Sequence, residues 1–321
     1  MSKRRLSHHQ QRRIKQAHHS LKSTDVDNEN TFHGLVISHR GGLINVENCH
    51  NNKQIKCKPR ANLGTIICGD KVIVQKQKGD YVIAAISERN NIIQRIDGFG
   101  KIHSVAANIS QLVIFMSVVP EPNIFLLDQY LVSAHINKIL PLIVLNKTDL
   151  LTNDPQDPFN LNAIYQPLGY TIHAISLKND AQFDAIEEQF KQHVNLISGV
   201  SGAGKSSLIK KILPQHDHIK VAEISAFNKE GKHTTRTSTL YHLPCGGQLI
   251  DTPGIRGFNP VFNDKDDIKK GFIEISALAT QCKFNNCEHT HEPQCAVLEA
   301  VEKGAISPSR YENYVKLLEN F

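Results

Sequence analysis

Residues 199–206 read Gly-Val-Ser-Gly-Ala-Gly-Lys-Ser and match the phosphate-binding pattern G-x-x-x-x-G-K-[ST]. The apolar run VNLIS precedes the segment and the helix-forming run KSSLIKKIL closes it. Glycines let the backbone curve around a phosphate with its N–H groups inward, and the helix N-terminus adds partial positive charge. Lys205 is expected to bridge the β- and γ-phosphates, and Ser206 to ligate Mg²⁺. The expected nucleotide contacts here are Gly199, Val200, Ser201, Gly202, Ala203, Gly204, Lys205, Ser206 and Ser207.

Strands and helices alternate around this loop. Continuous apolar runs such as QLVIFMSVV and PLIVLN are typical of parallel strands buried on both faces. Between them, FLLDQYLVSAHI and AQFDAIEEQFKQH have helical spacing, and Phe183, Ile186 and Phe190 share one face of the second helix. The pattern predicts an α/β domain with a mostly parallel sheet over residues 97–262.

A second motif selects the base. Asn146, Lys147, Thr148 and Asp149 follow a buried strand at its carboxyl end, where open α/β sheets bind ligands. An aspartate there can accept hydrogen bonds from the N1–H and amino groups of guanine. Adenine lacks this donor pair and would leave the carboxylate unpaired, so the motif favours GTP over ATP. Lys147 can pack its stem over the base, and Asn146 can tie this loop to the phosphate loop.

A third motif, Asp-Thr-Pro-Gly at 251–254, follows the apolar run GQLI. Asp251 suits a position behind the Mg²⁺ ligands, and the Gly254 amide suits a γ-phosphate contact. The polar segment before it contains Thr234 and Thr235, which we expect to contact nucleotide, with Thr235 completing the Mg²⁺ coordination.

The order of the motifs is permuted. Ser176-Leu177-Lys178, which is expected to offer backbone N–H groups to the guanine oxygen, and the N-K-T-D motif both precede the phosphate loop. In Ras-like GTPases both follow it. A circular permutation of this kind is tolerated because domain termini often lie close together. It also joins the segment after residue 254 to the C-terminal region, a route by which nucleotide state could reach that region.

The water-orienting position departs from the Ras pattern. Ras-like proteins place glutamine directly after D-x-x-G, and Ile255 stands there in this chain. Hydrolysis is therefore expected to be slow in the free protein. His233, beside the threonines, is the expected water-orienting group, with an exposed loop residue as the alternative reading; Arg256 or an RNA group would be next.

The N-terminal third contains two further segments. Residues 32–96 read as short β segments divided by turn signals such as Gly69-Asp70 and Gly79-Asp80. They predict a small barrel, of the five-stranded oligonucleotide-binding type or of the SH3-like type. Residues 1–31 are expected to be a disordered arm, because residues 1–24 contain seven Lys or Arg and no Asp or Glu. That arm is either a solvated tail or a phosphate-binding arm for nucleic acid.

The C-terminal region, residues 263–321, is expected to be helical around a zinc site. Cys282-x₄-Cys287-x-His289-x₅-Cys295 offers three thiolates and one imidazole, a set that suits one closed, structural Zn²⁺ site. His291 is a rival fourth ligand. Ser309 and Glu312 fit a capping box that would start the last helix.

Composition narrows the setting. The formal net charge is +6, and no run of about 18 apolar residues suggests a membrane-spanning helix. The basic N-terminus has no apolar stretch behind it, which argues against a secretory signal. The seven cysteines do not form a disulfide pattern, so we expect a cytoplasmic protein. We also expect a monomer without a membrane partner.

These features together resemble the RsgA (YjeQ) family of circularly permuted GTPases dependent on the small ribosomal subunit. The resemblance runs from about residue 33 to the end. It rests on AANISQLVIF, DQYL, NKTD, GVSGAGKSS, GKHTTR, DTPGIRGF and CKFNNCEHTHEPQCAV. It implies three domains: an oligonucleotide-binding barrel, a permuted GTPase and a C-terminal zinc domain. It also implies late maturation of the small subunit, with rRNA as partner and GTPase activity stimulated by the subunit.

By the same resemblance, Cys282, Cys287, His289 and Cys295 are the preferred zinc ligands and His291 is left out. One departure is Leu177, where the family usually has alanine. Two competing functions remain: an RNA-binding adaptor in which GTP is a structural ligand, and an ATP-dependent kinase, which the N-K-T-D motif disfavours. Lys205, Ser206 and Asp251 favour hydrolysis of GTP to GDP and phosphate.

Overall fold

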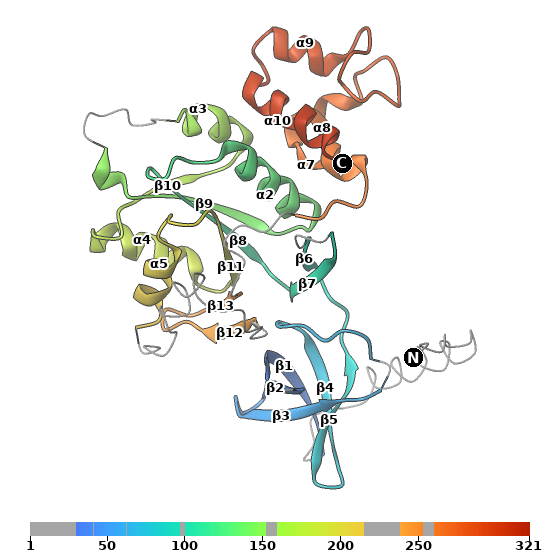
Figure 1. Cartoon of the computed structure of the whole chain (residues 1–321), viewed down its shortest axis with the longest axis vertical. Coiled ribbons are helices and arrows are strands. Elements are labelled where there is room, and N and C mark those ends of the chain that lie inside the picture. Colours follow the sequence, from blue (N-terminus) through green and yellow to red (C-terminus); the bar gives the residue numbers. More distant parts are fainter. Residues whose placement is uncertain are drawn as a thin grey trace. The chain divides into compact units, whose positions relative to one another are not determined.

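The structure is a computed structural model that describes residues 30–40, 42–61, 63–96, 100–151, 159–214, 238–252 and 260–321 (Figure 1). The chain forms two compact units. The first contains residues up to Asn90 with short segments at 106–108 and 237–240, and the second contains the remainder. None of the helices in these ranges is long and apolar enough to cross a membrane.

The first unit is a closed five-stranded barrel. Its strands are β1 (Thr31–Arg40), β2 (Leu43–Asn48), β3 (Gln54–Pro59), β4 (Lys71–Gln77) and β5 (Asp80–Ile86). They pair in the order β1-β2-β3-β5-β4, and β4 closes on β1. The β3–β5 pair is parallel while the others are antiparallel. This Greek-key closure confirms the oligonucleotide-binding type over the SH3-like alternative.

The barrel core uses the two-residue period of its strands. Val72 and Val74 of β4 point inward with Val36 of β1, and all three are fully buried. Gly34 lies where β1 bends closely over β2, because a Cβ there would come within 2.3 Å of Val46 Cγ1. Residues 32–96, the segment predicted to form the barrel, also contain β6 (Ile92–Ile96). This strand lies outside the barrel and pairs with β7 (Ile102–Ala107) in a separate two-stranded sheet.

The second unit is built on a parallel sheet, as expected. The strands β8 (Gln111–Ser117), β9 (Leu140–Asn146), β10 (Ile172–Ala174), β11 (Val194–Ser198) and β13 (Gln248–Asp251) run parallel in the order β10-β9-β8-β11-β13. The strand β12 (Thr239–His242) follows β13 in that order. The strands β8 and β11 lie side by side although about 80 residues separate them, with Ile114 opposite Ser198. The sheet therefore brings the two motif-bearing halves of the domain together.

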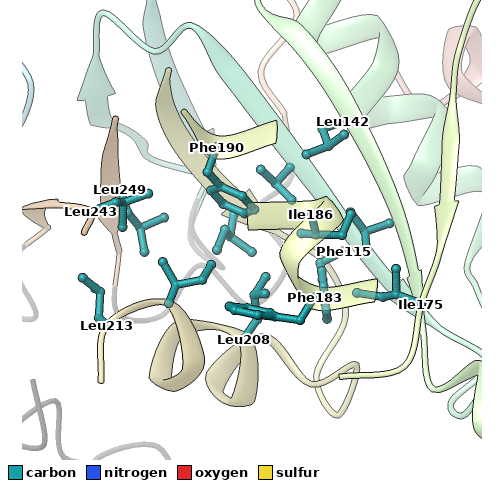
Figure 2. Close-up of a cluster of buried hydrophobic side chains, with 14 of the residues drawn as sticks. Phe115, Leu142, Ile175, Phe183, Ile186, Phe190, Leu208, Leu213, Leu243 and Leu249 are labelled. Atoms are coloured by element: carbon teal, nitrogen blue, oxygen red, sulfur yellow. The ribbon is translucent and has the colours of Figure 1, made fainter. Parts of the chain in front are cut away.

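Helices cover both faces of this sheet. The helices α4 (Asp180–Phe190) and α5 (Lys205–Ile212) bury Phe183 and Leu208 against Phe115 of β8 (Figure 2). The predicted apolar face of α4 is confirmed, because Phe183, Ile186 and Phe190 all lie in this core. The helix α2 (Ile124–Ile136) lies on the other face (Figure 1). The short α3 (Leu161–Tyr165) follows β9.

A buried asparagine fastens the segment that joins α4 to β11. Asn195 is fully buried, and its Nδ2 lies 3.0 Å from the carbonyl oxygen of Phe190, 3.2 Å from that of His193 and 2.9 Å from that of Gln248. These three carbonyls belong to the end of α4, to the connecting segment 191–193 and to β13. One side chain thus holds together the place where a Ras-like chain would have its two ends.

Within residues 260–321 the chain forms four helices: α7 (Lys265–Gly271), α8 (Ile273–Ala279), α9 (Ala296–Glu302) and α10 (Pro308–Glu319). The helix α7 crosses α2 so closely that a Cβ on Gly271 would lie 2.3 Å from Val132 Cγ1. The expected capping box at Ser309 is wrong, because α10 begins at Pro308 with Ser307 as N-cap. Proline is favoured at the first helical position, where its fixed φ suits the helix and no N–H is needed.

An ion-pair network lies inside this second unit. Arg310 of α10 donates to Asp128 of α2 at 2.6 Å and to Glu274 of α8 at 2.7 Å. Asp128 also accepts hydrogen bonds from Tyr165 Oη at 2.6 Å and from Asn313 Nδ2 at 2.7 Å. The side chains of Arg310 and Asp128 are each 1% exposed. Buried charges of this kind are stable only when paired and hydrogen-bonded, so the C-terminal helices are fixed to α2.

Candidate nucleotide and metal sites

The phosphate loop leaves β11 and enters α5, as its sequence predicts. Gly199 has φ 147°, and a Cβ there would lie 1.9 Å from the carbonyl oxygen of Phe115. Gly204 has φ 103°, and a Cβ there would lie 2.5 Å from Asn146 Nδ2. Both positions therefore require glycine for conformation and for space. The loop is packed tightly against β8 and the loop after β9.

Lys205 and Ser206 open α5, where the backbone N–H groups of a helix are unsatisfied and favour an anion. Lys205 Nζ donates to the carbonyl oxygen of Gly199 at 2.7 Å and also to that of Val200. The ammonium group is thus held within the curve of the loop. A positive charge at this position can form charge-assisted hydrogen bonds with the oxygens of a phosphate bound in the loop.

One side chain joins three loops. Asn146 is 3% exposed at the end of β9, and its Nδ2 donates to the Ala203 carbonyl of the phosphate loop at 2.9 Å. Its Oδ1 accepts from the Leu177 amide at 3.3 Å. The predicted tie between the Asn146 loop and the phosphate loop is therefore present, and the same residue also reaches the Ser176–Lys178 loop.

Lys147 makes a further bridge that the sequence did not indicate. It has left-handed backbone with φ 64°, and its Nζ donates to the Gly202 carbonyl at 2.7 Å and to the Val119 carbonyl. Val119 lies in the segment after β8 that leads to α2. The loop that carries Asp149 is thereby connected to the phosphate loop through two neighbouring side chains, Asn146 and Lys147.

Asp149 lies at the edge of this site with its carboxylate partly exposed. Its Oδ2 accepts from Lys178 Nζ at 2.6 Å and its Oδ1 from Ser176 Oγ at 2.8 Å. The hydrogen bond from Lys178, followed by that from Ser176, lowers the pKa of the Asp149 carboxyl below its ordinary value. The group is therefore ionised at neutral pH, the form that can accept both hydrogen bonds from guanine.

The Ser176–Lys178 loop is supported by α4. The Ser176 amide donates to Gln182 Oε1 at 2.7 Å, and the Lys178 amide reaches Ser176 Oγ at 3.3 Å. Leu177 is half-buried against the apolar core. Sequence reasoning missed Gln182, because a polar residue in the first turn of an amphipathic helix looks like any solvated one. Only the approach of helix and loop reveals its contact.

Asp251 ends β13, the strand paired with β11, which leads into the phosphate loop. Burial raises the pKa of its carboxyl, because partial loss of hydration disfavours the charged form. A divalent cation would remove that penalty, so the carboxylate fits a role near Mg²⁺. The other residues expected around the γ-phosphate, His233, Thr234, Thr235 and Gly254, lie outside the described residues, as does Ile255.

The C-terminal cluster has the dimensions of a zinc site. Its ligand atoms belong to Cys282, Cys287, His289 and Cys295, and all lie within 4.8 Å of one another. Cys282 Sγ and Cys295 Sγ are 3.8 Å apart, and His289 Nδ1 is 3.5 Å from each. Tetrahedral zinc with ordinary bond lengths requires about 3.8 Å between sulfurs and about 3.6 Å between sulfur and nitrogen. The four residues therefore fit one closed Zn²⁺ site, with His289 coordinating through Nδ1.

Helix α10 and one carboxylate support the metal loop. Tyr311 Oη donates to the His289 carbonyl at 2.9 Å, and Tyr314 Oη donates to the Glu288 carbonyl at 2.8 Å. Glu292 accepts from three backbone amides, those of Glu288 at 2.6 Å, Thr290 at 3.0 Å and His291 at 3.1 Å. These amides hold the pKa of Glu292 at about 2, against the effect of burial. His291 is exposed and outside the ligand cluster.

Asn146 and Lys147 thus hold a guanine-type loop against a phosphate loop, and the guanine-type loop comes first along the chain. This arrangement defines a circularly permuted GTPase. The family model of the RsgA GTPase matches residues 86–260, and the chain belongs to that family of GTP hydrolases.

Relatives and solved structures agree over nearly the whole chain. A protein of Saccharophagus degradans named small ribosomal subunit biogenesis GTPase RsgA is 38% identical, over 100% of this chain and 98% of its own. A Chromohalobacter salexigens protein of the same name is 39% identical, over 89% and 85%. The crystal structure of YjeQ from Thermotoga maritima superposes with a TM-score of 0.73 at 31% identity, over 90% of this chain and 98% of that one. The circularly permuted GTPase YloQ gives 0.70 at 27% identity, over 93% and 97%.

Proposed function

We propose that this chain hydrolyses GTP to GDP and phosphate on the small ribosomal subunit, late in its maturation and in the cytoplasm. The partner comes from the relatives, which carry the name small ribosomal subunit biogenesis GTPase and match this chain at full length. The chemistry comes from the site. The observation that carries it is Asn146, which joins the loop of Asp149 to the phosphate loop.

Each motif then has a role. Asp149 accepts hydrogen bonds from guanine, while Asn146, Lys147 and Thr148 hold its loop in place. The glycine-rich segment of 199–204 and Lys205 surround the phosphates, with Ser207 in the first turn of α5 beside them. The amides of Leu177 and Lys178, which lie 3.3 Å from Asn146 Oδ1 and Ser176 Oγ, would supply hydrogen bonds to the guanine oxygen.

The metals have separate roles. Ser206 and Thr235 would ligate Mg²⁺, with Asp251 behind them, and Mg²⁺ neutralises charge on the β- and γ-phosphates. Gly254 would offer its amide to the γ-phosphate. One Zn²⁺ would be held by the cysteine and histidine cluster and would stabilise the fold of the C-terminal region.

Stimulation by the subunit follows from the missing glutamine. With Ile255 after the Asp-Thr-Pro-Gly motif, a second group must order the attacking water. His233 lies in the threonine segment, and docking on rRNA would order that segment, a common form of switch. The bound GTP would then be hydrolysed only on the subunit, and hydrolysis would release the protein.

The rRNA contact would fall on the barrel and on the basic N-terminal arm. Exposed cationic side chains of the barrel supply phosphate-neutralising charge: Lys53, Lys56, Lys58, Arg60, Lys71, Lys76 and Lys78. Binding should therefore weaken as salt rises, and deletion of residues 1–24 should flatten that dependence if the arm contributes.

The test is GTP turnover by the full chain alone, with purified small subunits and with purified large subunits. We expect stimulation by small subunits alone. His233→Ala should reduce the stimulated rate by about 100-fold while GTP affinity holds. A rate that small subunits do not change, with tight GTP binding, would favour the RNA-binding adaptor. Equal affinity for ATP and GTP would exclude guanine recognition altogether.

A further inference from the structure

One lysine connects the helix of the phosphate loop to the loop expected to read the guanine oxygen. Lys211 lies on α5, six residues after Lys205. Its Nζ donates to the carbonyl oxygen of Leu177 at 3.0 Å and to Asp180 Oδ1 at 2.6 Å. Its ammonium also lies 4.6 Å from the ring centroid of Phe183. No sequence motif contains this residue.

The Leu177 carbonyl matters because a peptide unit is planar. Its C=O and the N–H of the next residue belong to one rigid plane and point in opposite directions. An anchor on the Leu177 oxygen therefore fixes where the Lys178 N–H points, which is toward Ser176 Oγ at 3.3 Å, beside Asp149. The preceding plane is held at both ends, because the Asn179 amide donates to the Ser176 carbonyl at 2.9 Å and the Leu177 N–H donates to Asn146 Oδ1 at 3.3 Å.

The two anchors differ in origin. The one on Ser176 is a local turn that the loop makes by itself. The one on Leu177 comes from α5, 34 residues further along the chain. Since α5 begins at the phosphate loop, Lys211 connects the Ser176–Lys178 loop to the helix that leaves the phosphate loop. Donors held in place before binding recognise an acceptor better than donors that must be ordered on binding.

The ion pair with Asp180 does not account for this placement. The Asp180 side chain is 87% exposed, and exposed pairs contribute little to stability. The Lys211 side chain is only 28% exposed, and it lies over Phe183 and reaches the loop carbonyl. Its neighbour Lys210 is exposed on the same helix and provides a matched control.

We propose that Lys211 is a positioning residue for guanine recognition, which acts by orienting the Leu177–Lys178 peptide toward the 6-oxygen of the base. The proposal rests on the guanine site put forward above. It predicts that loss of the Lys211 ammonium affects recognition of the 6-position and leaves recognition of the 2-amino group, which belongs to Asp149, unchanged.

The experiment measures the affinities of the full chain for four diphosphates, so that turnover plays no part. GDP is compared with 6-thioguanosine diphosphate, which keeps N1–H and the amino group but has a weaker acceptor at position 6. Inosine diphosphate keeps the oxygen and lacks the amino group, and ADP lacks both features. The variants are Lys211→Met, which keeps the stem over Phe183, Lys211→Arg, Asp180→Asn and Lys210→Met.

In the unmodified chain GDP should bind about tenfold tighter than its 6-thio analogue. Lys211→Met should reduce this ratio to about twofold or less, and leave the ratio of GDP to inosine diphosphate unchanged. Lys211→Arg should restore part of the 6-position ratio, and Lys210→Met should behave like the unmodified chain. Asp180→Asn should keep the ratio, because the carbonyl contact remains.

Two results would overturn the proposal. A 6-position ratio that survives Lys211→Met would make the residue merely structural, and a ratio lost in Asp180→Asn would assign the effect to the ion pair. If Lys211→Met does not fold, the Asp180→Asn and Lys211→Arg ratios still decide between carbonyl and carboxylate. Failure of the proposed function looks different, because the unmodified chain would then bind ADP as tightly as GDP.

Discussion

Asp128 and Asp149 are two aspartates of the same compact unit with similar partners and opposite settings. Each accepts a hydrogen bond from a cation and one from a hydroxyl group. Asp128 is 1% exposed and has Arg310 as its cation, whereas Asp149 is 28% exposed and pairs with Lys178, itself 79% exposed. The buried carboxylate is a permanent joint between helices. The exposed one can exchange an exposed lysine for a ligand, so burial decides which aspartate can recognise a base.

Removal of zinc is expected to have the largest effect on the buried Asp128–Arg310 contact. Helix α10 carries Arg310, and Tyr311 and Tyr314 of the same helix hold the metal loop. One Zn²⁺ per chain should be found by native mass spectrometry. Chelation or Cys287→Ser should unfold residues 282–321 first, since metal-binding energy there is folding energy.

Hydrogen exchange would show whether loss of protection begins in α9 and α10. Cys245→Ser is the matched control, because that cysteine lies outside the metal cluster. A native protein without metal, or normal helix content after chelation, would contradict the zinc site.

The next largest effect is expected from Arg310→Met. It leaves Asp128 and Glu274 buried and unpaired, which should lower the free energy of unfolding by about 3–5 kcal/mol. Urea unfolding measures it, with Glu312→Gln, exposed on the same helix, as control. Adding Asp128→Asn to Arg310→Met should recover part of the loss. If Arg310→Met has the same free energy of unfolding as the unmodified chain, the network does not stabilise the helix packing, and the contrast with Asp149 disappears.

Asp149→Asn should leave stability intact and change the ligand. GDP affinity should fall about 100-fold, because a charge-assisted pair of hydrogen bonds is lost. Xanthosine diphosphate, with a carbonyl in place of the amino group, should regain part of that affinity. Calorimetric titration of both nucleotides measures the exchange. Unchanged preference for GDP would show that the base is read elsewhere.

The smallest effect belongs to Lys178→Met. Because the pair with Asp149 is exposed, its loss should shift the melting temperature by less than about 2 °C. GDP affinity should stay within about threefold, with a weaker dependence on salt. A large loss of stability would mean that Lys178, like Arg310, is part of a fixed structure.

The contiguous motifs of this site could be predicted from sequence, and the long-range contacts could not. In the phosphate loop (199–206) and the Cys-x-His cluster, the residues that form each site are close together in the sequence. Their patterns were therefore sufficient to propose phosphate and metal chemistry. Arg310 meets Asp128 across 182 residues, and Lys211 meets Leu177 across 34. Such pairs depend on how helices pack, which periodicity alone does not specify. The start of α10 was missed for a local reason, since the proline signal at Pro308 outweighs the Ser309 capping pattern.

Asn195 marks the connection between α4 and β11 that the circular permutation creates, and this permuted order has a consequence for how the protein is synthesised. Translation produces the base-reading loops before the phosphate loop, because β9 precedes β11 in this chain. Asn195 and Ser206 emerge only after the strands β8, β9 and β10 exist, and until then the β11 side of β8 has no neighbour. At synthesis rates of roughly 5–20 residues per second, about 3–12 s separate Asn146 from Ser206. During that interval the nascent chain has half of a nucleotide site, so GTP cannot assist the first half of the sheet to fold.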